Sequence, residues 1–162
     1  MVRAAVRHQV PLSVLYAVGL TETGQAGELT PYSMNIDGLS VTAANLQDGV
    51  RRFEIAQREG AKLIDIGCMQ INYRYHAMNF ASLEDMFDPA KNVEYAAGFL
   101  QILKSREGSW TMAVARYNAG PDNDAAQKKY VCVVIANMVA SGLGAWTDNA
   151  ARFCGRRGSA FQ

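Results

Sequence analysis

The sequence predicts an α+β fold that is predominantly helical, with a small antiparallel hairpin or sheet inserted between helices. Apolar residues recur at three- and four-residue spacing over most of the chain, which is the period of an amphipathic helix. The stretch 31–42 breaks this period. Within it, Asp37–Gly38 separates two short runs, as in a hairpin whose turn needs positive φ. The chain has 162 residues, 49% hydrophobic and 19% charged, so we expect one globular domain over residues 1–162.

Two helices are expected before the hairpin, over residues 3–9 and 12–23. Gly24 ends the second helix, whose apolar face is formed by Leu12, Leu15, Tyr16 and Leu20. Arg3 and Arg7 before this apolar stretch also resemble the start of a secretory signal peptide. We favour the helix, because the sequence that follows at once carries candidate chemistry. An export signal would then lie upstream of this chain.

The region after the hairpin is expected to return to helix and then to add one strand. Thr42 is a typical helix cap, so we expect a helix over residues 43–58, closed by Gly60. Residues 62–66 form an expected third strand, and residues 65–67 turn the chain.

The second half of the chain is expected to be helical. Ser82 caps a short turn, Asp88–Pro89 and Ser109 are typical helix starts, and Gly108 and Gly120–Pro121 are typical helix ends. The helices expected here cover residues 89–106, 110–119, 124–140 and 148–153.

Charge excludes one class of partner. The net charge is +1 and the basic residues are scattered, whereas a nucleic-acid-binding protein usually has a basic stripe. We therefore expect no nucleic-acid partner. One dense cluster, Arg152, Arg156 and Arg157, is either a solvated tail or a contact with an anionic polymer or membrane. No apolar run is long enough for a transmembrane helix.

The three cysteines, Cys68, Cys132 and Cys154, lack the spacing of a metal site. Cys132 and Cys154 are either a disulfide in an oxidising compartment or buried free thiols, and the sequence leaves both open.

Glu22 is a candidate catalytic acid/base. It lies at the end of an apolar helix, where the core meets the surface. An apolar setting raises a carboxyl pKa, and a general acid that works near neutral pH needs a raised pKa. A carboxylate at a helix C-terminus also opposes the helix dipole, which requires a compensating reason. Taken alone, the position also has a plain structural explanation, namely a solvated residue at a helix end.

Two later segments offer polar groups suited to sugars. Gly67 lets the backbone approach another group, and Gln70 and Asn72 offer amides for sugar hydroxyls and N-acetyl groups. Tyr117 and Asn118 end a helix and offer an aromatic face with a hydroxyl and an amide. Taken alone, the first segment is also explained as a polar loop with a core methionine, and the second as an aromatic packing residue beside a helix end.

Taken together, these segments resemble a known family. Glu-Thr-Gly at 22–24, Gly-x-Met-Gln-x-Asn at 67–72, the block 92–100 and Tyr-Asn-Ala-Gly-Pro at 117–121 follow one another as in the SLT-type (soluble lytic transglycosylase) catalytic domain, which is related to goose-type lysozyme. The stretch 31–38 resembles a hairpin of a subgroup associated with secretion, pilus or conjugation machinery.

The resemblance covers about residues 5–125 and has two departures. Thr23 stands where the family usually has serine, which keeps the hydroxyl. Arg116 stands where the family usually has a small residue, which puts the packing there in doubt. Residues 125–162 carry no recognised signature, and we interpret them as specific to this branch.

The resemblance implies a lysozyme-like fold and a periplasmic or cell-envelope enzyme that cuts peptidoglycan between N-acetylmuramic acid and N-acetylglucosamine. Glu22 would protonate the leaving oxygen and then accept the proton of the muramyl C6 hydroxyl, which closes a 1,6-anhydro ring. No metal or organic cofactor is implied. A secretion, pilus or flagellar machine is a candidate partner. The implied substrate-binding residues are Thr23, Gly67, Met69 (as an apolar wall), Gln70, Asn72, Tyr117 and Asn118.

Two alternatives stay open. Ordinary glycosidases use two carboxylates, so Asp37 or Asp65 across a cleft from Glu22 would make the protein a hydrolytic muramidase. Both aspartates also have structural explanations, Asp37 in the hairpin turn and Asp65 at a strand end. An inactive peptidoglycan-binding scaffold module is the other alternative.

Overall fold

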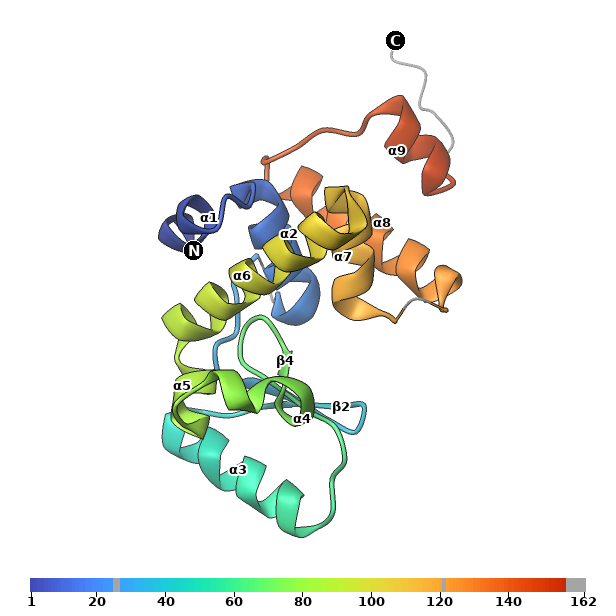
Figure 1. The fold of residues 1–162 in the computed structure, drawn as a ribbon. Coiled ribbons are helices and arrows are strands. Elements are labelled where there is room, and N and C mark those ends of the chain that lie inside the picture. Colours follow the sequence, from blue (N-terminus) through green and yellow to red (C-terminus); the bar gives the residue numbers. More distant parts are fainter. Residues whose placement is uncertain (25–26, 121, 157–162) are drawn as a thin grey trace.

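The computed structural model describes residues 1–24, 27–120 and 122–156. Within them it confirms the predicted α+β, lysozyme-like fold, mostly helical with a small antiparallel sheet inserted after the second helix (Figure 1). Two residues used in the sequence analysis, Pro121 and Arg157, lie outside the described residues. No helix in the described ranges has both the length and the apolar character needed to cross a bilayer.

The helical half of the molecule surrounds α2 (Leu12–Thr23). This helix packs on α8 (Asp124–Ala140), while α6 (Pro89–Glu107) packs on α7 (Trp110–Asn118). The short helix α1 (Val2–Arg7) contacts both α2 and α6, and ends two residues before the predicted boundary. The core side chains of α2, which are fully buried, are Leu15, Ala17 and Val18. Such burial fixes the position of the helix end that carries Glu22.

The other half of the molecule holds the sheet, with strand order β2-β1-β3-β4 and antiparallel pairing throughout. Asp37 (φ 48°) and Gly38 (φ 95°) form the predicted hairpin turn. Figure 1 shows α3 and α5 in this half, and α6 running from it into the helical half. The elements are β1 (Ser33–Ile36), β2 (Leu39–Thr42), α3 (Leu46–Arg58), β3 (Ile64–Ile66), β4 (Ile71–Asn72), α4 (Tyr73–His76), a 3₁₀ turn (Ala77–Asn79) and α5 (Leu83–Phe87).

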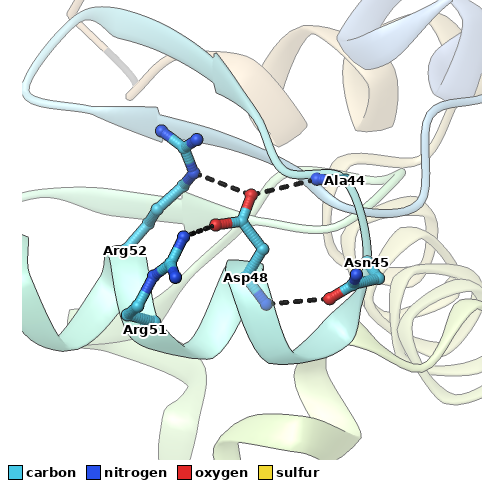
Figure 2. Close-up of polar contacts among 5 residues, drawn as sticks. All are labelled: Ala44, Asn45, Asp48, Arg51 and Arg52. Atoms are coloured by element: carbon cyan, nitrogen blue, oxygen red, sulfur yellow. Dashed lines mark hydrogen bonds and ion pairs between the residues drawn. The ribbon is translucent and has the colours of Figure 1, made fainter.

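The predicted start of α3 was wrong. Thr42 pairs with Ser33 and ends β2, and α3 begins only at Leu46. Asn45 is the true cap, since its side-chain oxygen accepts a hydrogen bond from the Asp48 backbone N–H at 3.0 Å (Figure 2). The Asp48 carboxylate also accepts from the Ala44 backbone N–H and from two arginines of the first turns of α3. Strand pairing therefore displaced the helix start by three residues.

Four predicted caps of the second half are confirmed, those at Ser82, Asp88, Gly108 and Ser109. Ser82 and Ser109 accept hydrogen bonds from backbone N–H groups of α5 and α7, and Asp88 does so for α6. Gly108 ends α6 in the left-handed conformation (φ 79°).

A disulfide holds the C-terminal region. Cys132 of α8 is bonded to Cys154, just after α9 (Asp148–Phe153), which decides between the two alternatives left by the sequence. Cys68 is a buried free thiol whose pKa burial raises to about 11. In Figure 1, α9 lies at the opposite end of the molecule from α3.

Candidate active site

Glu22 lies where the two halves of the molecule meet, in a cleft of about 560 Å³. The helical half contributes residues from the end of α2 and from α6 and α7. The sheet half contributes residues from all four strands and from α4. The described residues that line the cleft are Glu22, Asn35, Ser40, Leu63, Asp65, Gln70, Ile71, Asn72, Tyr75, His76, Phe99, Arg116, Tyr117, Asn118, Ala119 and Gly120.

The Glu22 carboxyl has a pKa raised from 4.5 to about 7, chiefly because burial disfavours its charged form. The negative charge of Asp65 raises this pKa further, while a hydrogen bond from the Tyr130 hydroxyl to Glu22 Oε1 lowers it. A pKa near 7 leaves the group able both to give and to take a proton at neutral pH, which is the property that a general acid/base needs.

Neighbouring threonines fix the end of α2. The Thr23 hydroxyl donates to the Cys68 carbonyl oxygen at 2.9 Å, and so joins α2 to the loop before β4. The Thr21 hydroxyl donates to the Ala17 carbonyl oxygen at 2.8 Å and accepts from the Asn137 amide of α8 at 3.0 Å. Glu22 is thus held between two helices and a loop. The hydroxyl that Thr23 keeps in place of the usual serine therefore makes a supporting hydrogen bond.

The loop from Gly67 to Gln70 wraps around the buried amide of Asn92. Asn92 Nδ2 donates to the Ile66 and Met86 carbonyl oxygens at 2.9 and 2.8 Å, and Asn92 Oδ1 accepts from the Met69 N–H at 2.9 Å. Gly67 has φ 80°, and a Cβ there would lie 2.4 Å from Asn92 Nδ2. Only glycine fits at this position.

Gln70 and Asn72 face the cleft from this loop and from β4. Gln70 adopts a positive φ of 49°, and its side-chain amide donates to the Gly67 carbonyl oxygen at 2.9 Å. Asn72 Nδ2 donates to Asp65 Oδ1 at 2.7 Å, whereas its Oδ1 is buried with no hydrogen-bond partner among the described residues. An unpaired buried acceptor at a cleft is suited to a ligand N–H or O–H group.

Tyr117 connects α7 to the same loop, since its hydroxyl donates to the Met69 carbonyl oxygen at 2.8 Å. Burial, together with the charge of Glu22, raises the Tyr117 pKa well above 10, so the hydroxyl stays neutral. Asn118 is exposed at the cleft edge.

The structure brings five of the eight predicted site residues to the cleft, namely Glu22, Gln70, Asn72, Tyr117 and Asn118. The other three predicted residues do not line the cleft; they are Thr23, Gly67 and Met69. The Met69 side chain is fully buried, and so it packs in the core where a cleft wall was expected. Asp37 lies outside the cleft, and its carboxylate accepts from the Lys62 and Leu63 backbone N–H groups. Asp65 does line the cleft.

Sequence reasoning gave no site role to Tyr130, Asn137, Asn92 or the cleft histidine His76, although Asn92 begins the motif block 92–100. Tyr130 and Asn137 are seven residues apart on α8 and therefore lie on one helix face. This spacing places both polar side chains on one face of α8, but it does not indicate what they contact. His76 Nδ1 hydrogen-bonds the Tyr95 hydroxyl at 2.8 Å, and burial lowers its pKa.

Among the described residues, no group of three or more His, Cys, Asp or Glu side chains could hold a metal ion. A family model, described as the transglycosylase SLT domain, matches residues 2–133. The match extends beyond both ends of the stretch 5–125 marked by the motifs, and it includes Tyr130. Neither the curated proteins nor the solved structures give a match to the chain.

Proposed function

The chain belongs to the transglycosylase SLT domain family, whose members cleave glycosidic bonds of peptidoglycan outside the cytoplasm, and from this membership we propose a lytic transglycosylase with Glu22 as its catalytic acid/base. The bond cut is the β-1,4 bond from N-acetylmuramic acid to N-acetylglucosamine, and the product is a 1,6-anhydro-muramyl end. The observation that carries the proposal is a cleft carboxyl with a pKa of about 7, hydrogen-bonded by Tyr130.

In the first step, protonated Glu22 gives its proton to the glycosidic oxygen. The bond from muramyl C1 to that oxygen breaks, and the electron pair leaves with the N-acetylglucosamine. Glu22 becomes a carboxylate, which the Tyr130 hydroxyl stabilises by donating to Oε1. One positioned acid/base contributes roughly 10²–10⁴-fold to such a rate.

In the second step, the muramyl C6 hydroxyl attacks C1. Its proton passes to the Glu22 carboxylate, which restores the starting acid. Because the substrate supplies the nucleophile, one carboxyl group is sufficient, and the remaining groups need only bind and position the sugars. We assign this binding role to Gln70, Asn72, Tyr117 and Asn118. Thr23, Gly67 and Met69 support the site from behind through the contacts described above.

A hydrolytic muramidase is the second candidate function, because Asp65 lines the same cleft as Glu22. It is the weaker candidate, since the Asp65 carboxylate is already engaged by the Asn72 amide at 2.7 Å. An inactive peptidoglycan-binding module is a third candidate, and the raised pKa of Glu22 speaks against it.

The test is mass spectrometry of the products from purified peptidoglycan, with the wild-type protein and Glu22→Gln. Anhydro-muramyl ends from the wild type alone support the proposal. Reducing ends would mean that water is the nucleophile and would direct attention to Asp65. Binding of peptidoglycan by both proteins without any product would favour the binding module.

We further propose that residues 1–162 act as one domain in local wall remodelling in the cell envelope or periplasm. A secretion, pilus or flagellar machine is the proposed partner, on the resemblance of the hairpin at 31–38 to a subgroup associated with such machines. Co-purification with envelope complexes from cells that carry a tagged protein tests this assignment, and a uniform distribution over the wall would contradict it.

A further inference from the structure

Arg116 is the single arginine or lysine among the described residues that line the cleft. It precedes Tyr117 on α7, and its side chain is 17% exposed. Its Nε donates to Glu107 Oε2 over 3.4 Å, a long hydrogen bond. Arg116 is thus a largely buried cation at the wall of a site proposed to bind a polymer.

The Arg116 guanidinium is only partly satisfied. Three buried side-chain atoms of the described residues have no hydrogen-bond partner, and two belong to cleft residues, Asn72 Oδ1 and Arg116 Nη1; the third is Gln101 Oε1. A guanidinium carries five N–H donors, and leaving a buried donor unpaired destabilises the folded protein. Its carboxylate partner Glu107 is shared with Arg106, whose Nε donates to Glu107 Oε1 at 3.0 Å. Arg116 therefore has donors available for a second anionic group.

The geometry of the guanidinium indicates which kind of ligand group could pair with its unpaired donor. Arginine matches planar carboxylates through two parallel N–H···O bonds. In peptidoglycan the sugar rings are neutral, and carboxylates occur on the muramyl substituent, in the lactyl group or in the peptide stem attached to it. We propose that Arg116 is a specificity residue that binds a carboxylate of this muramyl substituent. The inference rests on the proposed function, because it takes peptidoglycan as the ligand.

The test compares native peptidoglycan with the same material after carbodiimide-driven amidation by ammonia, which neutralises its carboxylates and leaves the sugars unchanged. We expect amidation to lower kcat/KM of the wild type by about tenfold, in line with the strength of a hydrogen bond to a charged group. Arg116→Gln should lose about as much on the native substrate and should process both substrates at the same rate. The two losses are then not additive, as expected for groups in contact.

Two further variants separate recognition from structure. Glu107→Gln removes the ion-pair partner and should keep the preference for the native substrate. Arg116→Lys keeps the positive charge but cannot form the two parallel N–H···O bonds of a guanidinium. It should therefore retain only part of the preference for the native substrate. The proposal is overturned if Arg116→Gln still distinguishes the two substrates as the wild type does, or if the wild type does not distinguish them.

A binding measurement separates failure of this inference from failure of the proposed function. If the wild type cleaves neither substrate, the proposed function fails, but co-sedimentation with native and amidated peptidoglycan still tests Arg116. Stronger binding to native material that disappears in Arg116→Gln supports the inference, and equal binding overturns it. Amidation of amidase-treated strands, whose remaining carboxylates are lactyl groups, identifies the source: slower cleavage assigns the lactyl group, and unchanged cleavage assigns the stem.

Discussion

The two halves of the molecule each place one carboxyl group in the cleft, and the two groups have different surroundings. Glu22 comes from the helical half, and its hydrogen-bond donor is the Tyr130 hydroxyl. Asp65 comes from the sheet, where its carboxylate accepts a hydrogen bond from the Asn72 amide. Burial raises both pKa values, but the Asp65 charge raises that of Glu22 further. The environment, more than the chemical group, assigns the acid role to Glu22.

The largest expected effect is that of Glu22→Gln on activity. Removal of the proton donor should lower turnover of peptidoglycan by roughly 10²–10⁴-fold, while the isosteric amide keeps the fold. Turnover is measured as the release of soluble fragments, with circular dichroism as the check on folding. Glu28→Gln, an exposed residue shortly after α2, is the matched control and should keep full activity. Retained activity in Glu22→Gln would move the acid role to the sheet half.

Glu22→Gln should also change how stability depends on pH. The carboxyl pKa is about 7 in the folded protein against 4.5 for the free group, so protonation of Glu22 stabilises the fold. This contribution is fully present below pH 4.5 and is lost as the pH rises through 7. Relative to the wild type, the variant should therefore gain up to about 3 kcal/mol between pH 4.5 and pH 8. Thermal unfolding at both pH values measures it, and a constant difference in Tm would contradict the raised pKa.

Tyr130→Phe should have an intermediate effect. Loss of the hydroxyl removes the hydrogen bond that lowers the pKa of Glu22, so the alkaline limb of the pH–rate profile should move to higher pH. Turnover at neutral pH should fall by about tenfold, because the carboxylate formed in the first step loses its donor. Tyr16→Phe is the matched control, since its hydroxyl donates to the Gly27 carbonyl oxygen outside the cleft. An unmoved alkaline limb would leave Tyr130 with a packing role.

Asp65→Asn should have the smallest effect on rate. The asparagine can still accept from Asn72, and we expect turnover within about threefold of the wild type with anhydro-muramyl products. Loss of the Asp65 charge should lower the pKa of Glu22 and move the alkaline limb to lower pH, opposite to Tyr130→Phe. Complete loss of activity in Asp65→Asn would instead make Asp65 the base of a hydrolase. The same would follow if the wild type gave reducing-end products and the variant gave none.

Local signals predicted most of the fold, since a turn or a cap depends on neighbouring residues alone. Asp37–Gly38, Ser109 and Gly108 are such cases. The start of α3 was mispredicted, because the choice of Asn45 over Thr42 depends on pairing of β2 with β1.

The site was predicted less completely than the fold. Glu22 could be found from its helix end and the motif order. Tyr130 is 108 residues away in the sequence, and no local pattern predicts that its hydroxyl meets Glu22. The family resemblance implied that Met69 is an apolar wall of the cleft, but its side chain fills the core beside Gly19. Contacts between distant segments decided both outcomes.

The contact between Gly67 and Asn92 has a consequence for how this protein can change over generations. Any side chain at position 67 would collide with the Asn92 amide, and loss of that amide would leave the Ile66, Met69 and Met86 backbone groups unpaired. Neither residue can therefore be substituted while the other stays unchanged. In related chains we expect the two residues to be inherited as a pair, so that a substitution at one is accompanied by a substitution at the other.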